Sequence, residues 1–382
     1  MNRVLFVSNG HGEIAIAARL ALELQAQRPM LCDHLALVGD FHYPSTMREV
    51  GPRRALPSGG VVAMGNVRNI LRDVRAGLAG HTLAQLRFLR GVRGSYDAAI
   101  AVGDIFALVM ALQVRARAAA FVGTAKSAYV APYGRFEARV LRSADVVFVR
   151  DAATAQDLAR RGIEARAANA IADLYADDAQ EIDAPYDPCL AIFPGSRETA
   201  YGDACMLARV LRAVAREQPG AGALISIAPG IDARSMCARF EADGWRAARR
   251  EDPQQPFVLY DGDREVARAW TGALGAMLRR ATIVLGQAGT ANEAAAAMGI
   301  PVVAFARAGE HRTPWYRMRQ VGLLGEAMLV AGADPQLAAR QVVELLHDPA
   351  RRERMGKIGR ERMGPGGAAA LIAARIAQVM KQ

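Results

Sequence analysis

The chain has 382 residues, a formal net charge of +10, and hydrophobic side chains at 52% of its positions. This length suits two domains of ordinary size, and this hydrophobic content excludes an intrinsically disordered chain. No apolar run approaches the roughly 18 residues that a membrane span needs, and the positive charge points to an anionic partner.

The four cysteines are spread along the chain without the paired spacing of a metal or redox site: Cys32, Cys189, Cys205 and Cys237. Reduced thiols within a core fit this pattern. The chain begins with a short apolar run that has neither the basic n-region nor the long h-region of a secretion signal. We therefore expect a cytoplasmic protein.

The first apolar run, residues 3–7, predicts a strand, and residues 14–24 carry apolar side chains at helical spacing. The loop between them, SNGHGE, places polar groups where the first strand of an open α/β sheet commonly meets a ligand. His11 is a candidate catalytic group there, and a helix-capping or merely exposed histidine is the alternative. Gly10, Gly12 and Glu13 are candidates for contact with the same ligand.

A second candidate catalytic group, Asp104, follows the apolar run of residues 98–102. An aspartate just past a parallel strand points into the cleft where ligands of such sheets bind, so it could act as a general base. The alternative is an N-cap for the helix expected at residues 105–112.

Another strand is expected at residues 118–122, followed by the loop Gly123-Thr124-Ala125-Lys126-Ser127. Thr124, Lys126 and Ser127 could hold a phosphate or an acceptor group, although the loop lacks the spacing of a Walker P-loop. A further strand is expected at residues 145–149. The first half thus alternates strand and helix, which predicts a parallel sheet covered on both faces.

Basic side chains gather between residues 53 and 93 against a single acid: Arg53, Arg54, Arg68, Arg72, Arg75, Arg87, Arg90 and Arg93. Apolar residues are interleaved with them. Such a stretch suits an anionic membrane surface, where each basic residue contributes about 1 kcal/mol, and Arg68, Arg72, Arg75, Arg87 and Arg90 would face the lipid. A solvated helix face is the alternative. Nucleic acid is disfavoured, because no aromatic stacking platform accompanies the arginines.

An acidic stretch that ends at Pro188 predicts the boundary between two domains. We expect an N-terminal domain at residues 1–168, a linker at 169–188, a C-terminal domain at 189–363, and a final helix within 364–382 that packs back on the N-terminal domain.

The second domain opens with an expected strand at residues 189–193 and the loop Pro194-Gly195-Ser196-Arg197. Backbone N–H groups at Gly195 and Ser196, together with the Arg197 guanidinium, suit a diphosphate or the edge of a nucleobase; a surface turn is the alternative. Further strands are expected at residues 222–227 and 257–260, and a helix at 265–280.

The segment of residues 281–305, ATIVLGQAGTANEAAAAMGIPVVAF, has the pattern of a strand, a glycine turn, a helix and a second strand. A helix that starts from such a turn presents unpaired N–H groups and the positive end of its dipole, which bind anions. The candidate binding residues are Gln287, Gly289, Thr290, Ala291 and Glu293. An ordinary buried crossover helix is the alternative.

These motifs resemble a known family. IFPGSR at residues 192–197, GTA at 289–291 and NAIAD at 169–173 are similar to elements of lipid A disaccharide synthase, a glycosyltransferase of the GT-B fold. SNGHGE, FVGTAKS and AGTANE look like the lipid A disaccharide synthase-related proteins. The resemblance covers most of the chain, and it implies two Rossmann-like, doubly wound parallel-sheet domains that face a central cleft.

The resemblance further implies that Gly195, Ser196 and Arg197 contact a nucleotide and that Gly289 and Thr290 hold its diphosphate. Glu293 stands one position before the place of the synthase's ribose-binding glutamate. The residues of the first domain, Gly10, Gly12, Glu13, Thr124, Lys126 and Ser127, would lie on the acceptor side.

We therefore expect an inverting transfer of a sugar, of the N-acetylglucosamine type, from a UDP-sugar to a lipid-linked or amphiphilic acceptor at the inner face of the cytoplasmic membrane. Asp104 or His11 would be the base, and neither a metal nor another cofactor is expected. Two alternatives are a UDP-sugar 2-epimerase and a non-enzymatic, membrane-associated protein that binds nucleotide sugars.

Overall fold

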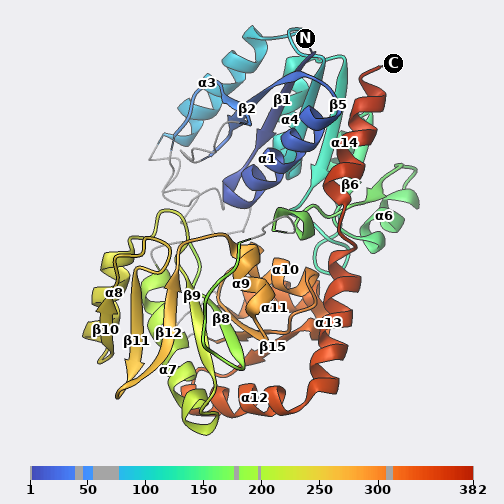
Figure 1. Ribbon diagram of the computed structural model, residues 1–382. Helices are drawn as coiled ribbons and strands as arrows, with labels where there is room; N and C mark the ends of the chain where they lie inside the picture. Colours follow the sequence, from blue (N-terminus) through green and yellow to red (C-terminus); the bar gives the residue numbers. More distant parts are fainter. Residues whose placement is uncertain are drawn as a thin grey trace. The chain divides into compact units, whose positions relative to one another are not determined.

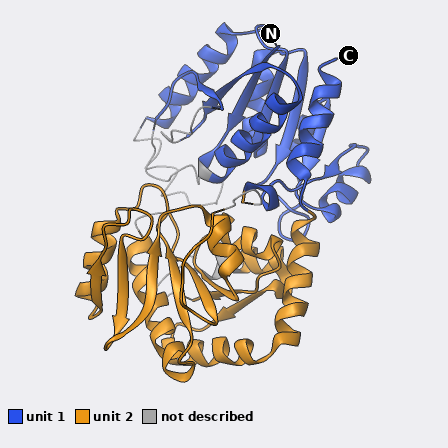
Figure 2. Ribbon diagram, in the orientation of Figure 1, with its two compact units in different colours: residues 1–174, 366–382 blue, residues 175–365 orange. Residues whose placement is uncertain are grey.

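The computed structural model describes residues 2–38, 46–54, 77–175, 180–196, 199–306 and 313–381, without the side chains of residues 11 and 313–317. The chain forms two compact units, which Figure 2 colours separately. Unit 1 comprises Met1–Leu174 and Gly366–Gln382, and unit 2 comprises Tyr175–Pro365.

Unit 1 is an α/β unit built on one parallel sheet. Its strands are β1 (Asn2–Ser8), β2 (Met30–Ala36), β3 (Arg48–Glu49), β4 (Ala98–Gly103), β5 (Ala118–Gly123), β6 (Val146–Val149) and β7 (Arg166–Ala167), and its helices are α1 (Gly10–Gln27), α3 (Leu78–Gly91), α4 (Ile105–Ala111), α5 (Arg135–Leu141), α6 (Ala152–Ala159) and α14 (Ala368–Val379). Among the described residues the strand order is β3-β2-β1-β4-β5-β6-β7. Every paired strand runs parallel to its neighbour.

Helices cover both faces of this sheet. Leu5 and Val7 of β1 belong to a buried cluster that also contains Leu108 of α4 and Leu141 of α5. The β1 residues between and beside them are equally buried, although their side chains point to the opposite face. Figure 1 shows α1 and α14 side by side, and the two helices contact each other closely.

Unit 2 holds a mixed sheet. Its strands are β8 (Cys189–Phe193), β9 (Gly222–Ser226), β10 (Arg246–Arg249), β11 (Phe257–Asp261), β12 (Arg264–Trp270), β13 (Ile283–Gly286), β14 (Val302–Phe305) and β15 (Met328–Ala331), and its helices are α7 (Ala200–Glu217), α8 (Ala233–Ala242), α9 (Leu274–Arg280), α10 (Thr290–Ala297), α11 (Thr313–Leu324), α12 (Pro335–His347) and α13 (Pro349–Met363). In the described part of the chain the strand order is β10-β11-β12-β9-β8-β13-β14-β15.

The antiparallel edge of unit 2 corrects one expectation. Residues 265–280 were expected to form a single helix, but 264–270 form β12, and only Leu274–Arg280 is helical. β12 pairs antiparallel with β11 across a turn in which Asp261 and Arg264 are partners and Gly262 has φ +65°. A glycine at positive φ in a two-residue turn favours a tight hairpin. This local signal outweighs the helical propensity of the Arg- and Ala-rich run.

The boundary between the units also differs from the expected linker. Residues 169–174 belong to unit 1, where Ala172–Leu174 form a short 3₁₀ turn. The carboxylate of Asp173, which is 4% exposed, accepts hydrogen bonds from the backbone N–H groups of Gly367 (2.5 Å) and Ala369 (2.7 Å). Asp173 therefore caps α14 and joins the two points at which the chain leaves and re-enters unit 1.

In unit 2, α10 and α13 pack backbone against backbone. A Cβ atom added to Gly359 of α13 would lie 2.4 Å from the Ala296 carbonyl oxygen, and one added to Gly356 would lie 2.3 Å from that of Gly299. Real Cβ atoms do not approach this closely, so both glycines are required by the contact. The alanine-rich helix α10 is thus held in place by α13.

We predict that Asp173→Ala destabilises the protein by about 2 kcal/mol, because two N–H groups of a buried helix start lose their acceptor. The matched control is Asp334→Ala, which removes the exposed cap of α12 and should cost about 1 kcal/mol. Urea unfolding measures both. Equal losses in the two variants would contradict a special role for Asp173.

We predict that Gly359→Ala lowers stability by about 2 kcal/mol, since α13 must move away from α10. Gly202→Ala in α7 is the control: nothing lies within 4 Å of the added Cβ atom, and alanine favours a helix by about 0.5–1 kcal/mol over glycine. The two variants should therefore shift the urea midpoint in opposite directions. A Gly359→Ala variant as stable as the wild type would refute the close contact.

Candidate functional site

Each sheet has one point at which successive strands turn to opposite sides. In unit 1 this point lies between β1 and β4, and in unit 2 between β8 and β13. In open α/β sheets ligands bind outside the carboxyl ends of the strands at such a point. The sequence candidates follow these strands: Gly10 to Glu13 come after β1, Asp104 after β4, Gly195 and Ser196 after β8, and Gln287 to Glu293 after β13.

Asp104 is the N-cap of α4. Its carboxylate accepts a hydrogen bond from the Ala107 N–H group at 3.0 Å. Burial raises the pKa of this carboxyl, and hydrogen bonds from Ala107, Phe106 and Asn9 offset part of that rise. The capping alternative from the sequence therefore holds in the structure. It leaves a carboxylate with a raised pKa at the switch point of unit 1, which is the property a general base needs.

Glu13 lies beside Asp104 over two glycines. Gly10 has φ +56° and Gly103 has φ +133°, conformations that favour glycine. A Cβ atom on Gly103 would lie 3.3 Å from Glu13 Cγ, and one on Gly10 would lie 3.0 Å from Glu13 Oε2. Thr124 Oγ1 donates a hydrogen bond to Glu13 Oε1 at 3.4 Å. The structure thus brings together Gly10, Glu13 and Thr124.

The other two candidates of the SNGHGE segment are Gly12 and His11. Gly12 lies in the first turn of α1. His11 is in the same turn, and its side chain lies outside the described residues.

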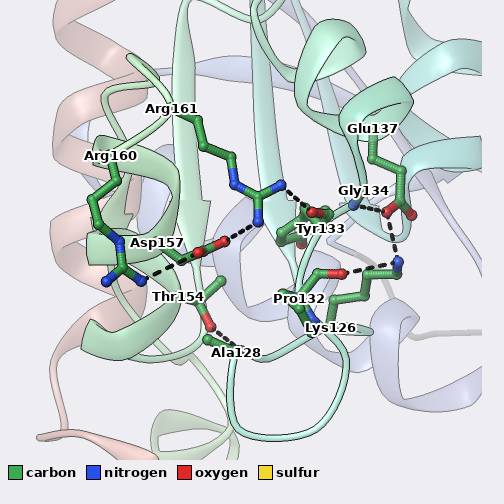
Figure 3. A network of polar contacts seen from close by, with 10 residues as sticks. All are labelled: Lys126, Ala128, Pro132, Tyr133, Gly134, Glu137, Thr154, Asp157, Arg160 and Arg161. Atoms are coloured by element: carbon green, nitrogen blue, oxygen red, sulfur yellow. Dashed lines mark hydrogen bonds and ion pairs between the residues drawn. The ribbon is translucent and has the colours of Figure 1, made fainter.

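Lys126 and Ser127 each interact with a residue nearby in sequence, as Figure 3 shows for Lys126. Lys126 Nζ lies 2.6 Å from Glu137 Oε2, an oxygen that also accepts from the Gly134 N–H group. Ser127 is buried, and its Oγ accepts a hydrogen bond from the Tyr129 N–H group. The ion pair with Glu137 fastens the loop after β5 to α5, and the Ser127 contact closes a turn within the loop.

The loop after β8 contains Gly195 at φ +112°, and nothing lies within 4 Å of a Cβ atom placed there. The backbone conformation, and not crowding, therefore requires glycine at this position. Ser196 follows it in the described chain, whereas Arg197 lies outside the described residues.

Gln287 connects three strand ends of unit 2. Its N–H group donates to the Phe193 carbonyl at 2.8 Å, and its side-chain Nε2 donates to the Phe305 carbonyl at 3.1 Å. The side-chain Oε1 is buried and has no hydrogen-bond partner among the described residues. A buried acceptor without a partner is costly, which makes Gln287 a candidate for ligand contact.

The helix α10 begins with Gly289 as its N-cap and Thr290 as its first residue. Asn292 is fully buried and donates through Nδ2 to the Gly286 carbonyl at 3.3 Å, so it faces the strand. Glu293, one residue and about 100° further round the helix, is half-buried in the first turn. The turn is held by Gln320 of α11, whose Nε2 donates to the Ala288 carbonyl at 3.0 Å.

Helix α3, which carries Arg87 and Arg90, has one buried face and one exposed face. His81, Gln85 and Leu89 are buried, which leaves Arg87 and Arg90 exposed on the opposite side. Arg68, Arg72 and Arg75 lie outside the described residues. No helix in the described part of the chain has the length and apolar character to cross a membrane.

Sequence reasoning missed a buried pair at the end of β1. Ser8 Oγ lies 2.8 Å from His34 Nε2, and both residues are at most 3% exposed. Burial and the nearby Arg53 charge lower the pKa of His34 to about 4. The sequence around His34 does not indicate this contact, because its partner Ser8 lies 26 residues earlier in the chain.

We predict an acid-dependent loss of stability from His34. Its folded pKa lies below the ordinary value of 6.5, so stability is present above pH 6.5 and is lost as the pH falls towards 4, by up to about 3 kcal/mol. His34→Gln should flatten this slope in urea unfolding, whereas His347→Gln at the exposed end of α12 should not. An unchanged slope in His34→Gln would contradict the buried neutral histidine.

Comparisons with known proteins support the fold. No protein-family model matches the chain, and no curated protein matches it. The solved structures similar to it include a Staphylococcus aureus MnaA–UDP complex (TM-score 0.60, 13% identity, 100% of this chain and 97% of that one). The calicheamicin glycosyltransferase CalG4 has a TM-score of 0.58 with 15% identity over 100% and 99% of the chains.

A third similar structure is the UDP-N-acetylglucosamine 2-epimerase of Neisseria meningitidis bound to UDP-N-acetylglucosamine. It has a TM-score of 0.56 and 13% identity, over 98% of this chain and 100% of that one. The chain therefore has two Rossmann-like α/β domains, the fold of GT-B glycosyltransferases and UDP-N-acetylglucosamine 2-epimerases.

Proposed function

We propose that the protein is a glycosyltransferase that moves a sugar from a UDP-sugar to a lipid-linked or amphiphilic acceptor. The observation that carries this proposal is the switch point of unit 2, where an open glycine loop after β8 adjoins the N-terminus of α10. That arrangement supplies N–H groups and a helix dipole for a diphosphate. Proteins of the same fold are solved with UDP or a UDP-sugar.

The donor would bind to unit 2. Gly195 and Ser196 would offer N–H groups on one side of the diphosphate, and Gly289, Thr290 and Ala291 on the other. Arg197 would add a charge, and Gln287 Oε1 would accept a hydrogen bond from the nucleoside. The developing charge of the leaving UDP would thus be stabilised by the helix N-terminus and a guanidinium, an arrangement that needs no metal ion.

The acceptor would bind to unit 1. An inverting displacement needs a base on the acceptor hydroxyl, and the raised pKa of Asp104 makes its carboxylate a stronger base. Glu13 and Thr124 lie beside Asp104 and would orient the hydroxyl, and His11 is the second candidate base.

The acceptor class rests on motif and charge. SNGHGE, FVGTAKS and AGTANE resemble the lipid A disaccharide synthase-related proteins, which favours a lipid acceptor and a sugar of the N-acetylglucosamine type. Exposed Arg87 and Arg90 on α3, with the exposed Leu83 one turn before Arg87, would contact an anionic membrane surface. We therefore propose a peripheral location on the inner face of the cytoplasmic membrane.

A UDP-sugar 2-epimerase is the second candidate, because epimerases of this fold are as similar to the chain as glycosyltransferases are. Proton NMR of UDP-N-acetylglucosamine incubated with the protein alone separates the two. Appearance of the epimer without any acceptor would favour the epimerase and would reject the transferase.

We predict that UDP raises the melting temperature of the wild-type protein, since a ligand at 100 times its dissociation constant adds about 2.7 kcal/mol of stability. Ala291→Glu should weaken UDP binding at least tenfold, because a carboxylate at the start of α10 repels the diphosphate. The matched control, Ala291→Gln, has the same size without the charge and should keep most of the affinity. Equal affinity in the two variants would remove the diphosphate from α10.

A further inference from the structure

Tyr133 and Asp151 of unit 1 each have one buried polar atom that lacks a hydrogen-bond partner among the described residues. These atoms are the hydroxyl oxygen of Tyr133, a residue 2% exposed, and Oδ2 of Asp151, a residue 6% exposed. A buried polar group without a hydrogen bond destabilises the folded state, and native proteins keep few of them. Neither residue has a part in the proposed reaction so far.

Tyr133 places its hydroxyl over the end of β5. A Cβ atom on Gly123, the last residue of that strand, would lie 2.5 Å from the Tyr133 hydroxyl oxygen, so the glycine makes room for it. The ring packs edge-on against Phe121, with centroids 6.3 Å apart. Burial raises the pKa of Tyr133, so the hydroxyl keeps its proton and can donate it in a hydrogen bond.

Asp151 lies at the end of the neighbouring strand. Gly123 of β5 is paired with Val149 of β6, and Asp151 comes two residues after Val149. Its Oδ1 caps α6 by accepting from the N–H and Oγ1 groups of Thr154 at 2.8 and 2.7 Å. Its Oδ2 takes no part in that cap. An acceptor and a donor without partners therefore stand at adjacent strand ends.

The segment of residues 124–132 lies beside both residues and is fastened by side chains. Lys126 Nζ is 5.8 Å from the centroid of the Tyr133 ring, and Ala128 contacts the Thr154 hydroxyl that donates to Asp151. The Ala128 N–H group donates to Thr154 Oγ1 at 2.8 Å, and Lys126 pairs with Glu137 at 2.6 Å, as Figure 3 shows. Arg150 donates to the Thr124 carbonyl at 2.9 Å. These contacts can be released without breaking a strand pair of the sheet.

We propose that Tyr133 and Asp151 form a binding site for a hydroxyl-rich group, a sugar, which residues 124–132 cover when the site is empty. One ligand hydroxyl donates to Asp151 Oδ2, and another accepts a hydrogen bond from Tyr133. That this sugar is part of the acceptor molecule in the transfer reaction rests on the proposed function. Tyr133 and Asp151 belong to unit 1, whereas the proposed donor residues belong to unit 2.

The first test compares two tyrosines with equal burial. Tyr133→Phe removes a hydroxyl without a partner, so its melting temperature should equal or exceed that of the wild type. Tyr96→Phe removes a hydroxyl that donates to Asp33 at 2.8 Å and should melt about 2–4 °C lower. A similar fall for Tyr133→Phe would show that its hydroxyl is already satisfied and would overturn the proposal.

The second test measures sugar binding directly. Saturation-transfer NMR would compare the wild type with Tyr133→Phe and Asp151→Asn, using N-acetylglucosamine, glucose and galactose as probes. Asparagine keeps the Oδ1 cap of α6 while it removes the charge. We expect the wild type to bind at least one probe and each variant to bind it at least tenfold more weakly.

The outcomes separate this site from the proposed function. UDP should shift the melting temperature of both variants as it does the wild type, because UDP binds elsewhere. No probe bound by the wild type, or equal binding by the variants, overturns the sugar site. If UDP does not raise the melting temperature of the wild type, the donor assignment is overturned and the result on sugar binding is unaffected.

Discussion

The connection of parallel strands by crossover helices is the constraint on which the rest of the structure depends. A hairpin cannot join two parallel neighbouring strands, so the chain returns through a helix to the same starting edge. Every loop that follows a parallel strand therefore lies at one edge of the sheet. In unit 1 this edge gathers Glu13, Asp104 and Thr124, and in unit 2 it gathers Gly195 and Gly289, although these residues are far apart in sequence.

Buried polar groups of this protein are of two kinds: those whose hydrogen bonds are satisfied within the fold, and those that keep an atom without a partner. Asp33 is 1% exposed and accepts from Arg3, Arg48 and Tyr96. Burial alone would raise its pKa, but these hydrogen bonds and the Arg48 charge outweigh burial and lower it. Two buried oxygens at the carboxyl ends of strands differ from Asp33: Gln287 Oε1 and Asp151 Oδ2 have no hydrogen-bond donor in the described chain. Both atoms lie just after the carboxyl ends of strands, where we propose that ligands bind.

The sequence allowed the architecture and the position of most candidates to be predicted. The apolar run, glycine turn and alanine-rich helix of residues 281–305 appear as β13, α10 and β14. Asp104 illustrates a limit, since capping and catalysis demand the same residue type at the same place. The helix expected at residues 265–280 was wrong in its first half, because pairing with β11 decides the structure of β12. Arginine and alanine carry little strand signal by themselves.

Residues that act through distant partners were out of reach of sequence reasoning. Asp173 accepts a hydrogen bond from the N-cap residue of a helix, Gly367, which lies 194 residues later. Gln320 of α11 holds the turn before α10. The sequence offers no reason to single out Tyr133, because only the fold places its hydroxyl against Gly123. No local period or spacing encodes such contacts, whereas the glycines that permit them, Gly10, Gly103 and Gly123, are visible in the sequence without their reason.

The central claim is that unit 2 binds the diphosphate of a UDP-sugar at the start of α10. Hydrogen–deuterium exchange with and without UDP tests it most directly, because it reports the backbone N–H groups that the ligand contacts. We expect UDP to slow exchange at residues 289–293 and at Gly195 and Ser196, with unit 1 unchanged. Slowed exchange confined to other segments, or no slowing anywhere at saturating UDP, would contradict the account.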